Sequence, residues 1–347
     1  MRAVAPQTAQ RHSRAPRAHH HWVVVAFATL VVAIAYLCLS ISQAISGHSD
    51  ERIQAAPLIV PAPGEQDETA AVPDPPTVEA SVAESAPPAP APVRGLAPAV
   101  GDPALLAAIQ DALGEDRDHV AVSVRRISDG RSAAVNGDYQ FYAASTFKLA
   151  VLYEVERRIS TGDLRLDDRV TISGEDAAED LGTLAALPLA PDGSLTIGDA
   201  LRAMVTHSDN ASAVALLHLV GAANVDATLR RIGAADLSVN TRDLPATAAG
   251  MARLMEAIVR GENLSPDARR HARDLLLAQE WREGIPAGLP PGATAGNKTG
   301  TWEGLTHDIG FVEAPGGTYV IAVLSAHGWV WDPIARISAA AWNELTR

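Results

Sequence analysis

Two serines and two lysines, distributed over three short motifs, are the residues whose types and spacing could do chemistry. Ser145 and Lys148 lie three positions apart, at the start of an apolar stretch that runs to Leu152. If this stretch is a buried helix, the two residues share one face and the hydroxyl can meet the amine. A buried lysine favours its neutral form, which can take a proton from serine. The motif therefore predicts a lysine-activated serine nucleophile, although a capping serine followed by an exposed lysine would show the same spacing.

Each of the other two motifs is ambiguous by itself, and their joint occurrence with the first makes an active site the better interpretation. Ser208-Asp209-Asn210 follows an apolar stretch, and by itself it also suits a helix N-cap. Lys298-Thr299-Gly300 precedes the C-terminal strands, where a lysine often protects a sheet edge. The chain has 28 basic residues, of which only two, Lys148 and Lys298, are lysines, and both fall inside these motifs. The three motifs together indicate one active site.

The order Ser-x-x-Lys, Ser-Asp-Asn, Lys-Thr-Gly resembles the signature of the penicillin-recognising serine hydrolases, and class A β-lactamases most closely. The resemblance covers about residues 101–347. It implies that Ser145 is the acylated nucleophile, that Lys148 is its base or proton shuttle, and that Ser208 passes a proton to the departing nitrogen.

The same resemblance implies the residues that hold the substrate. Asn210 would bind the substrate amide, and Lys298 with Thr299 would hold its carboxylate. The backbone N–H groups of Ser145 and Thr301 would form the oxyanion hole. No cofactor and no metal are implied, and the expected substrate is a β-lactam or a peptidoglycan peptide.

One part of the class A pattern is missing. In that family a glutamate in a Glu-x-x-x-Asn loop, between the second and third motifs, positions the water that releases the acyl group. The corresponding segment here, residues 234–240, is several residues shorter and has no glutamate. Asp236 and Asn240 have the Asp-x-x-x-Asn spacing, so Asp236 is the candidate base, and a solvated loop aspartate is the alternative. The residues that the resemblance implies for acylation are thus all present, whereas Asp236 is the only candidate base for fast deacylation.

The elements expected to position these residues are strands at both ends of a helical middle. Residues 145–283 are predicted to be mostly helical, and helices are expected at 102–113 and from Asp332 to the end, with Trp329 and Trp331 packed before the last one. Strands are expected at 119–127, 132–136, 297–302, 308–312 and 318–325. This order predicts an α+β fold, with an antiparallel sheet flanked by the terminal helices and an inserted all-helical subdomain.

Three further regions precede this domain. Residues 1–21 contain four arginines and no acid, and residues 22–42 begin with 20 uncharged, largely apolar residues. About 20 apolar residues span a bilayer as a helix, and basic residues stay on the cytoplasmic side. We therefore expect a cytoplasmic tail, a transmembrane signal-anchor, and an extracytoplasmic domain at 101–347. A cleaved signal peptide is the alternative. Residues 43–100 include 11 of the 23 prolines, and are predicted to form a disordered linker.

Composition excludes some other classes of protein. The net charge of −13 argues against nucleic acid as a partner, and a single cysteine, Cys38, excludes an intramolecular disulfide. We expect a monomer. A D,D-peptidase-like peptidoglycan enzyme that β-lactams inhibit stays open as an alternative, as does a non-catalytic wall-binding domain.

Overall fold

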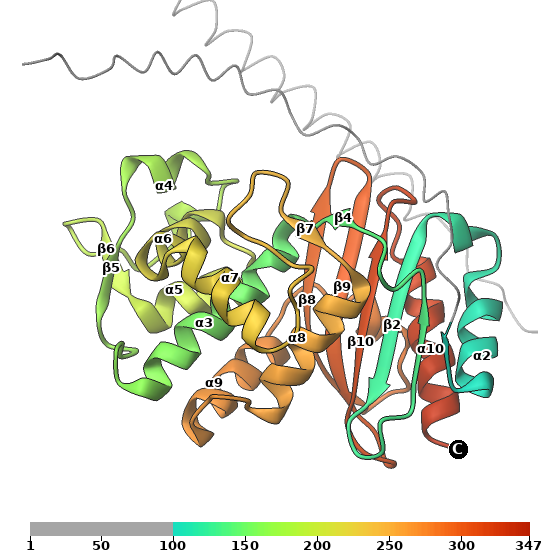
Figure 1. Ribbon diagram of the computed structural model, residues 1–347. Coiled ribbons are helices and arrows are strands. Elements are labelled where there is room, and N and C mark those ends of the chain that lie inside the picture. The colour runs from blue at the N-terminus through green and yellow to red at the C-terminus, as the bar shows by residue number, and fades with distance from the viewer. Residues whose placement is uncertain (1–99) are drawn as a thin grey trace, which may run out of the picture. The chain divides into compact units, whose positions relative to one another are not determined.

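The computed structural model describes residues 100–347, and its centre is a six-stranded antiparallel sheet (Figure 1). The strand order is β1-β3-β2-β10-β9-β8, so strands from the two ends of the sequence lie side by side. The strands are β1 (Val100–Gly101), β2 (Val120–Arg126), β3 (Ser132–Val135), β8 (Thr294–Trp302), β9 (Leu305–Glu313) and β10 (Tyr319–Ser325). Two pairs of short strands lie outside this sheet: β4 (Phe141–Tyr142) with β7 (Pro245–Ala246), and β5 (Arg169–Thr171) with β6 (Ser194–Thr196).

Helices cover both faces of the sheet (Figure 1). The terminal helices α2 (Pro103–Leu113) and α10 (Asp332–Leu345) pack together on one face. On the other face α8 and α9 contact the strands, and the remaining helices extend from them as a helical region. The helices of this second side are α3 (Lys148–Thr161), α4 (Gly174–Ala178), α5 (Ile197–Thr206), α6 (Asn210–Val220), α7 (Ala222–Arg231), α8 (Ala248–Arg260) and α9 (Pro266–Leu277).

Strand β10 shows why the sheet needs cover on both faces. All seven of its residues are buried, and alternate side chains enter different cores because successive strand residues point to opposite faces. Val320, Ala322 and Leu324 join the core on the side of the helical region. Tyr319, Ile321 and Val323 join the core beneath α2 and α10.

The predicted α+β fold, with terminal helices and an inserted helical region, is confirmed. The strands expected at 119–127 and 132–136 form a hairpin, with Val122 opposite Val135, and Asp102 caps α2, the helix expected at 102–113. The strand predicted at 297–302 is longer, because pairing with β9 extends it back to Thr294. The prediction for Trp329 was wrong, since 70% of this residue is exposed. The predicted tail, transmembrane helix and most of the linker lie outside the described residues.

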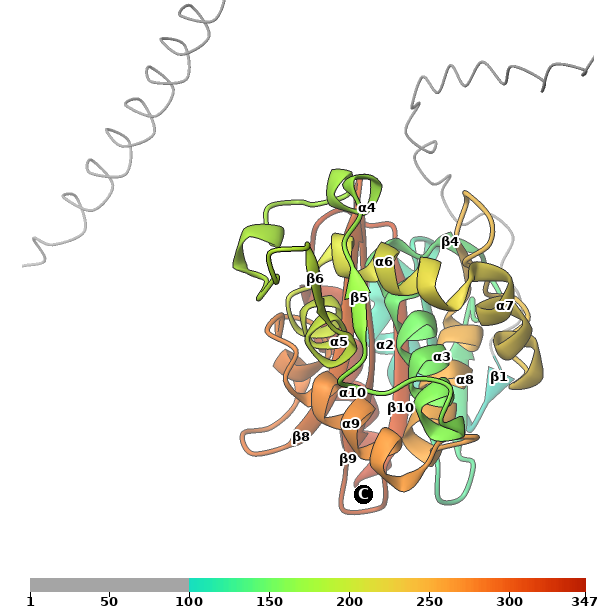
Figure 2. The same ribbon diagram turned by 90° about the vertical axis from the view of Figure 1, so that its left-hand side faces the viewer.

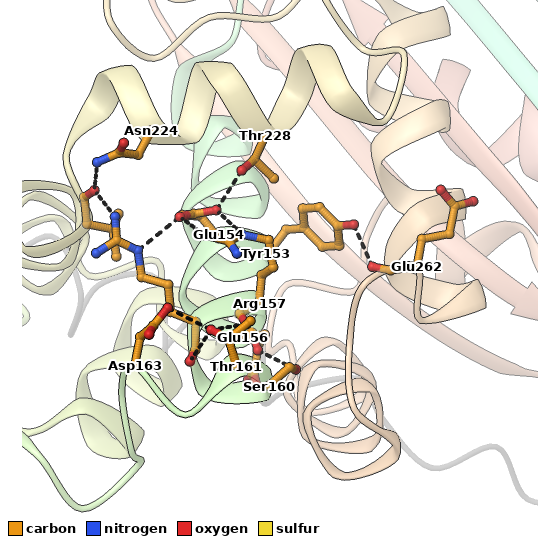
Figure 3. Close-up of polar contacts among 12 residues, drawn as sticks. Tyr153, Glu154, Glu156, Arg157, Ser160, Thr161, Asp163, Asn224, Thr228 and Glu262 are labelled. Carbon is orange, nitrogen blue, oxygen red and sulfur yellow. Dashed lines mark hydrogen bonds and ion pairs between the residues drawn. The ribbon is translucent and has the colours of Figure 1, made fainter.

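Helix α3 is central to the helical region and contacts α5, α6, α7, α8 and α9 (Figure 2). A buried carboxylate ties it to α7. Glu154 accepts hydrogen bonds from Arg157, Arg158 and Thr228, the last at 2.8 Å (Figure 3). The hydrogen bonds to these donors hold the pKa of Glu154 below its ordinary value although burial opposes them.

Within residues 100–347, no single helix is long and apolar enough to cross a bilayer. Helices α6 and α7 together meet the criteria of length and composition, with a bend of 79° between them.

Candidate active site

Ser145 lies in a short 3₁₀ turn, η2 (Ala144–Phe147), that leads directly into α3. Ala144, the residue before it, has a φ of 46°, a left-handed conformation that is costly for a residue with a Cβ. Such backbone strain persists only where the surrounding structure imposes it. The turn places Ser145 at the buried start of α3, with its side chain still partly accessible.

Lys148 is the first residue of α3 and is fully buried. Its Nζ atom lies 3.2 Å from Ser145 Oγ, 3.2 Å from Ser208 Oγ, 2.7 Å from the Ser208 carbonyl oxygen and 2.6 Å from Asn210 Oδ1. Burial lowers the pKa of Lys148 to about 7, and the carboxylate of Asp209 opposes this shift only in part. Near neutral pH the amine is therefore divided between its charged form and its neutral, proton-accepting form.

The Ser208-Asp209-Asn210 segment both caps helix α6 and contacts Lys148. Asp209 is the N-cap of α6, and its Oδ1 accepts a hydrogen bond of 2.6 Å from the N–H of Ser212. Ser208 has a φ of 60°, and this left-handed backbone turns both its carbonyl and its hydroxyl toward Lys148. The capping role and the site role suggested by the sequence are both present, but they belong to different residues.

Lys298 enters the cluster from β8 and is also fully buried. Its Nζ donates to Ser208 Oγ at 3.0 Å and to the carbonyl oxygen of Thr299 at 2.8 Å. Burial and the nearby Lys148 amine lower the pKa of Lys298 well below its ordinary value. Ser208 Oγ thus bridges the two amines, and a continuous path of polar contacts runs from Ser145 through Lys148 and Ser208 to Lys298.

Strand β8 packs against the turn that carries Ser145, and Gly300 is the point of contact. A Cβ at Gly300 would lie 3.1 Å from the backbone nitrogen of Ser145 and 2.9 Å from Thr146 Cγ2, closer than side chains tolerate. Only a glycine lets the strand approach so closely. Thr301 follows Gly300 directly on β8, next to this close contact with the turn that carries Ser145.

Asp236, the predicted base, has no hydrogen bond to this cluster within residues 100–347. Its carboxylate accepts a hydrogen bond from Thr247 Oγ1, at the N-cap of α8, and lies against Gly250. Among residues 100–347, no carboxylate is hydrogen bonded to Ser145, Lys148 or the Lys298 amine. The same part of the chain has no group of three His, Cys, Asp or Glu side chains that could hold a metal ion.

His307 is a residue that the sequence motifs did not identify. It is fully buried on β9, directly opposite Gly300. Ser325 N donates to its Nδ1 at 3.1 Å, so the ring proton lies on Nε2, which donates to the carbonyl oxygen of Tyr142 at 3.0 Å. No motif surrounds His307, and only its tertiary contacts reveal its place beside the site.

Comparison with known proteins agrees with this geometry. A sequence profile of the beta-lactamase enzyme family matches residues 104–345, which is most of the chain. The chain belongs to the beta-lactamase enzyme family. It therefore belongs with the class A β-lactamase-like serine hydrolases, as the three motifs indicated.

Solved structures of β-lactamase-like proteins share its fold. The β-lactamase of Sphaerobacter thermophilus is 26% identical with a TM-score of 0.62, and the match covers 70% of this chain and 97% of that one. A mutant of PBP-A, solved as an acyl-enzyme complex with penicillin G, is 26% identical with a TM-score of 0.64, over 69% of this chain and 95% of that one. A variant of the reconstructed class A β-lactamase of the last common ancestor of Gram-negative bacteria is 28% identical, with a TM-score of 0.60, over 70% and 98%.

Proposed function

We propose that this β-lactamase family protein is a serine hydrolase in which a β-lactam or a related peptide amide acylates Ser145. The observation that carries the proposal is the 3.2 Å contact between Ser145 Oγ and the buried Lys148 amine, whose pKa is about 7. A base with a pKa near the working pH is both available and strong enough to take a proton. The PBP-A mutant that resembles this chain was captured with penicillin G, which makes penicillin the natural first probe.

In the proposed acylation, a proton moves from Ser145 through Lys148 and Ser208 to the departing nitrogen. Neutral Lys148 takes the proton of Ser145 as Oγ attacks the carbonyl carbon, and the oxygen of the substrate gains negative charge. The N–H groups of Ser145 and Thr301 stabilise that charge, and a donor of this kind is often worth about 2.7–4 kcal/mol. The C–N bond then breaks, Ser208 gives its proton to the departing nitrogen, and Ser208 recovers a proton from the neighbouring ammonium.

The remaining residues of the motifs hold the substrate in this proposal. Lys298 and Thr299 bind its carboxylate, Lys298 through the N–H donors of its amine and Thr299 as a hydroxyl donor. Asn210 Oδ1 already accepts from Lys148, which leaves its amide nitrogen to donate to a substrate carbonyl.

Deacylation is proposed to be slow. Thr247 binds the carboxylate of Asp236, and no hydrogen bond joins Asp236 to the cluster around Ser145. Lys148 is then the base left to activate water, and it must be neutral again after each acylation. A long-lived acyl-enzyme is the behaviour of a penicillin-inhibited D,D-peptidase, and this observation favours that activity as the second candidate.

The location of the enzyme is also a proposal. Residues 22–42 are proposed to anchor the chain in a membrane, and residues 43–100 to hold the catalytic domain away from it, toward the cell wall. The length of the uncharged segment and the basic residues before it support this arrangement.

Mass spectrometry of the intact full-length protein, mixed with benzylpenicillin in detergent and followed over time, tests the function. We expect a mass increase equal to the whole penicillin, located on Ser145 and persisting for hours, and no adduct in Ser145→Ala. A transient adduct with rapid formation of product would instead show an efficient β-lactamase. The absence of any adduct would refute the proposal and favour a non-catalytic wall-binding domain.

A further inference from the structure

The segment that carries the nucleophile has few attachments to the main sheet. Residues 141–147 pair with β7 and hydrogen bond to Leu244, and neither of these belongs to the six-stranded sheet. Within the described chain, the bond from His307 Nε2 to the carbonyl oxygen of Tyr142 is the one hydrogen bond that joins residues 141–147 to that sheet. The two elements otherwise meet by packing, with Gly300 against the turn.

This bond lies where small displacements matter. The two backbone N–H groups of the proposed oxyanion hole come from η2, through Ser145, and from β8, through Thr301. On the neighbouring strand, His307 lies opposite Gly300, the residue that precedes Thr301. Its Nε2 atom donates to the carbonyl oxygen of Tyr142, three residues before Ser145. His307 therefore links the strand paired with β8 to the segment that leads into Ser145.

The surroundings of His307 fix its ring in one orientation. Both nitrogens have backbone partners, at 3.0 and 3.1 Å, and the ring of Phe141 lies edge-on at 5.7 Å with an interplanar angle of 84°. Burial lowers the pKa of His307 to about 4, so the ring is neutral and keeps this one tautomer at neutral pH. A neutral ring with a single N–H can serve both partners only in the orientation observed.

We propose that His307 is a positioning residue, which sets the distance between the N–H of Ser145 and that of Thr301 by binding the backbone of Tyr142. The inference rests on the proposed acylation of Ser145. It assigns no contact with substrate to His307, which acts only through the turn it holds. Reactive geometry is sensitive to such supports, because a displacement of about 1 Å can cost roughly 100-fold in rate.

Two amide substitutions separate the two bonds of the ring. The amide nitrogen of His307→Gln can take the place of Nε2 and donate to Tyr142, whereas the shorter His307→Asn places its oxygen near Nδ1, where it accepts from Ser325 but cannot reach Tyr142. A merely structural histidine would lose stability in both variants. If His307 positions the turn, the acylation rate constant should fall mainly in the asparagine variant.

The test measures two quantities on the full-length protein in detergent, with His271→Asn as control. His271 also donates to a buried partner, Glu156 on α3, but lies outside the site. The first quantity is the rate constant of acylation by benzylpenicillin at saturation, separated from its binding constant. The second is backbone hydrogen exchange in peptides that cover residues 141–147, which needs no substrate.

We expect His307→Asn to acylate about 10- to 100-fold more slowly at an almost unchanged binding constant, and to exchange faster over 141–147. His307→Gln should stay within a few-fold of wild type in both measurements, and so should His271→Asn. Equal losses in the two His307 variants, or unchanged exchange over 141–147 in His307→Asn, would overturn the proposal. If the wild type forms no adduct, the proposed function fails, and the exchange measurement still decides whether His307 holds the turn.

Discussion

The pH dependence of Ser145 acylation should report the titration of Lys148. Burial lowers the pKa of this amine from its ordinary 10.5 to about 7. At pH 7.5 roughly three-quarters of the molecules then carry the neutral amine, against about one in a thousand at the ordinary value. Only the neutral amine accepts the serine proton, so the acylation rate constant should rise with pH and level off above about 7.

Replacing Asp209 should shift the pKa of Lys148 and so tests this reasoning. Its carboxylate raises the pKa of Lys148 against the effect of burial, and Asp209→Asn removes the charge while keeping an oxygen that can cap α6. The pKa of Lys148 should fall further, and the inflection of the profile should move to lower pH. The assay is the acylation rate constant for a chromogenic cephalosporin from pH 5 to 9, with thermal melting to establish the folded range.

Asp226→Asn is the matched control. Asp226 is also largely buried and also accepts backbone and side-chain hydrogen bonds, from Val239 N and Ser238 Oγ, but it is not among the groups that shift the pKa of Lys148. Its profile should keep the wild-type inflection. A rate constant that does not change between pH 5 and 9, or an inflection that moves to higher pH in Asp209→Asn, would refute the role of Lys148 as the base.

Three other substitutions test separate parts of the structure. Lys148→Arg should slow acylation at least about 100-fold, because a guanidinium does not give up its proton. Intact-protein mass spectrometry measures the rate, and a cooperative thermal melt shows that the variant is folded. Gly300→Ala should slow acylation about 10- to 100-fold, since the added methyl would press on the backbone nitrogen of Ser145; a wild-type rate would contradict the close contact. Glu154→Ala should lower the free energy of unfolding by about 3 kcal/mol, because it leaves two arginines and Thr228 without their buried acceptor; denaturant unfolding measures this, and acylation per folded molecule should not change.

The candidate site residues and the order of the elements could be predicted from the sequence alone. Lys148 and Lys298 stood out because the chain otherwise uses arginine, and the three-residue spacing of Ser145 and Lys148 fixes their proximity on any helix start. Local signals such as the Asp102 cap and the strands expected at 119–127 and 132–136 depend on neighbouring residues, and the structure confirms them. These features depend on contacts a few residues apart.

Features that depend on contacts between distant parts of the chain could not be predicted in this way, and they appear only in the folded protein. Lys298 meets Ser208 across 90 residues, and the burial that lowers the pKa of Lys148 arises only in the folded chain. Asp236 has the right spacing in sequence, but Thr247 binds its carboxylate. His307 has no motif and acquires its place only when β9 carries it beneath the turn of Ser145. Spacing along the chain specifies which groups could react, whereas packing sets their distances and their charge, because burial and long-range contacts arise only when the chain folds.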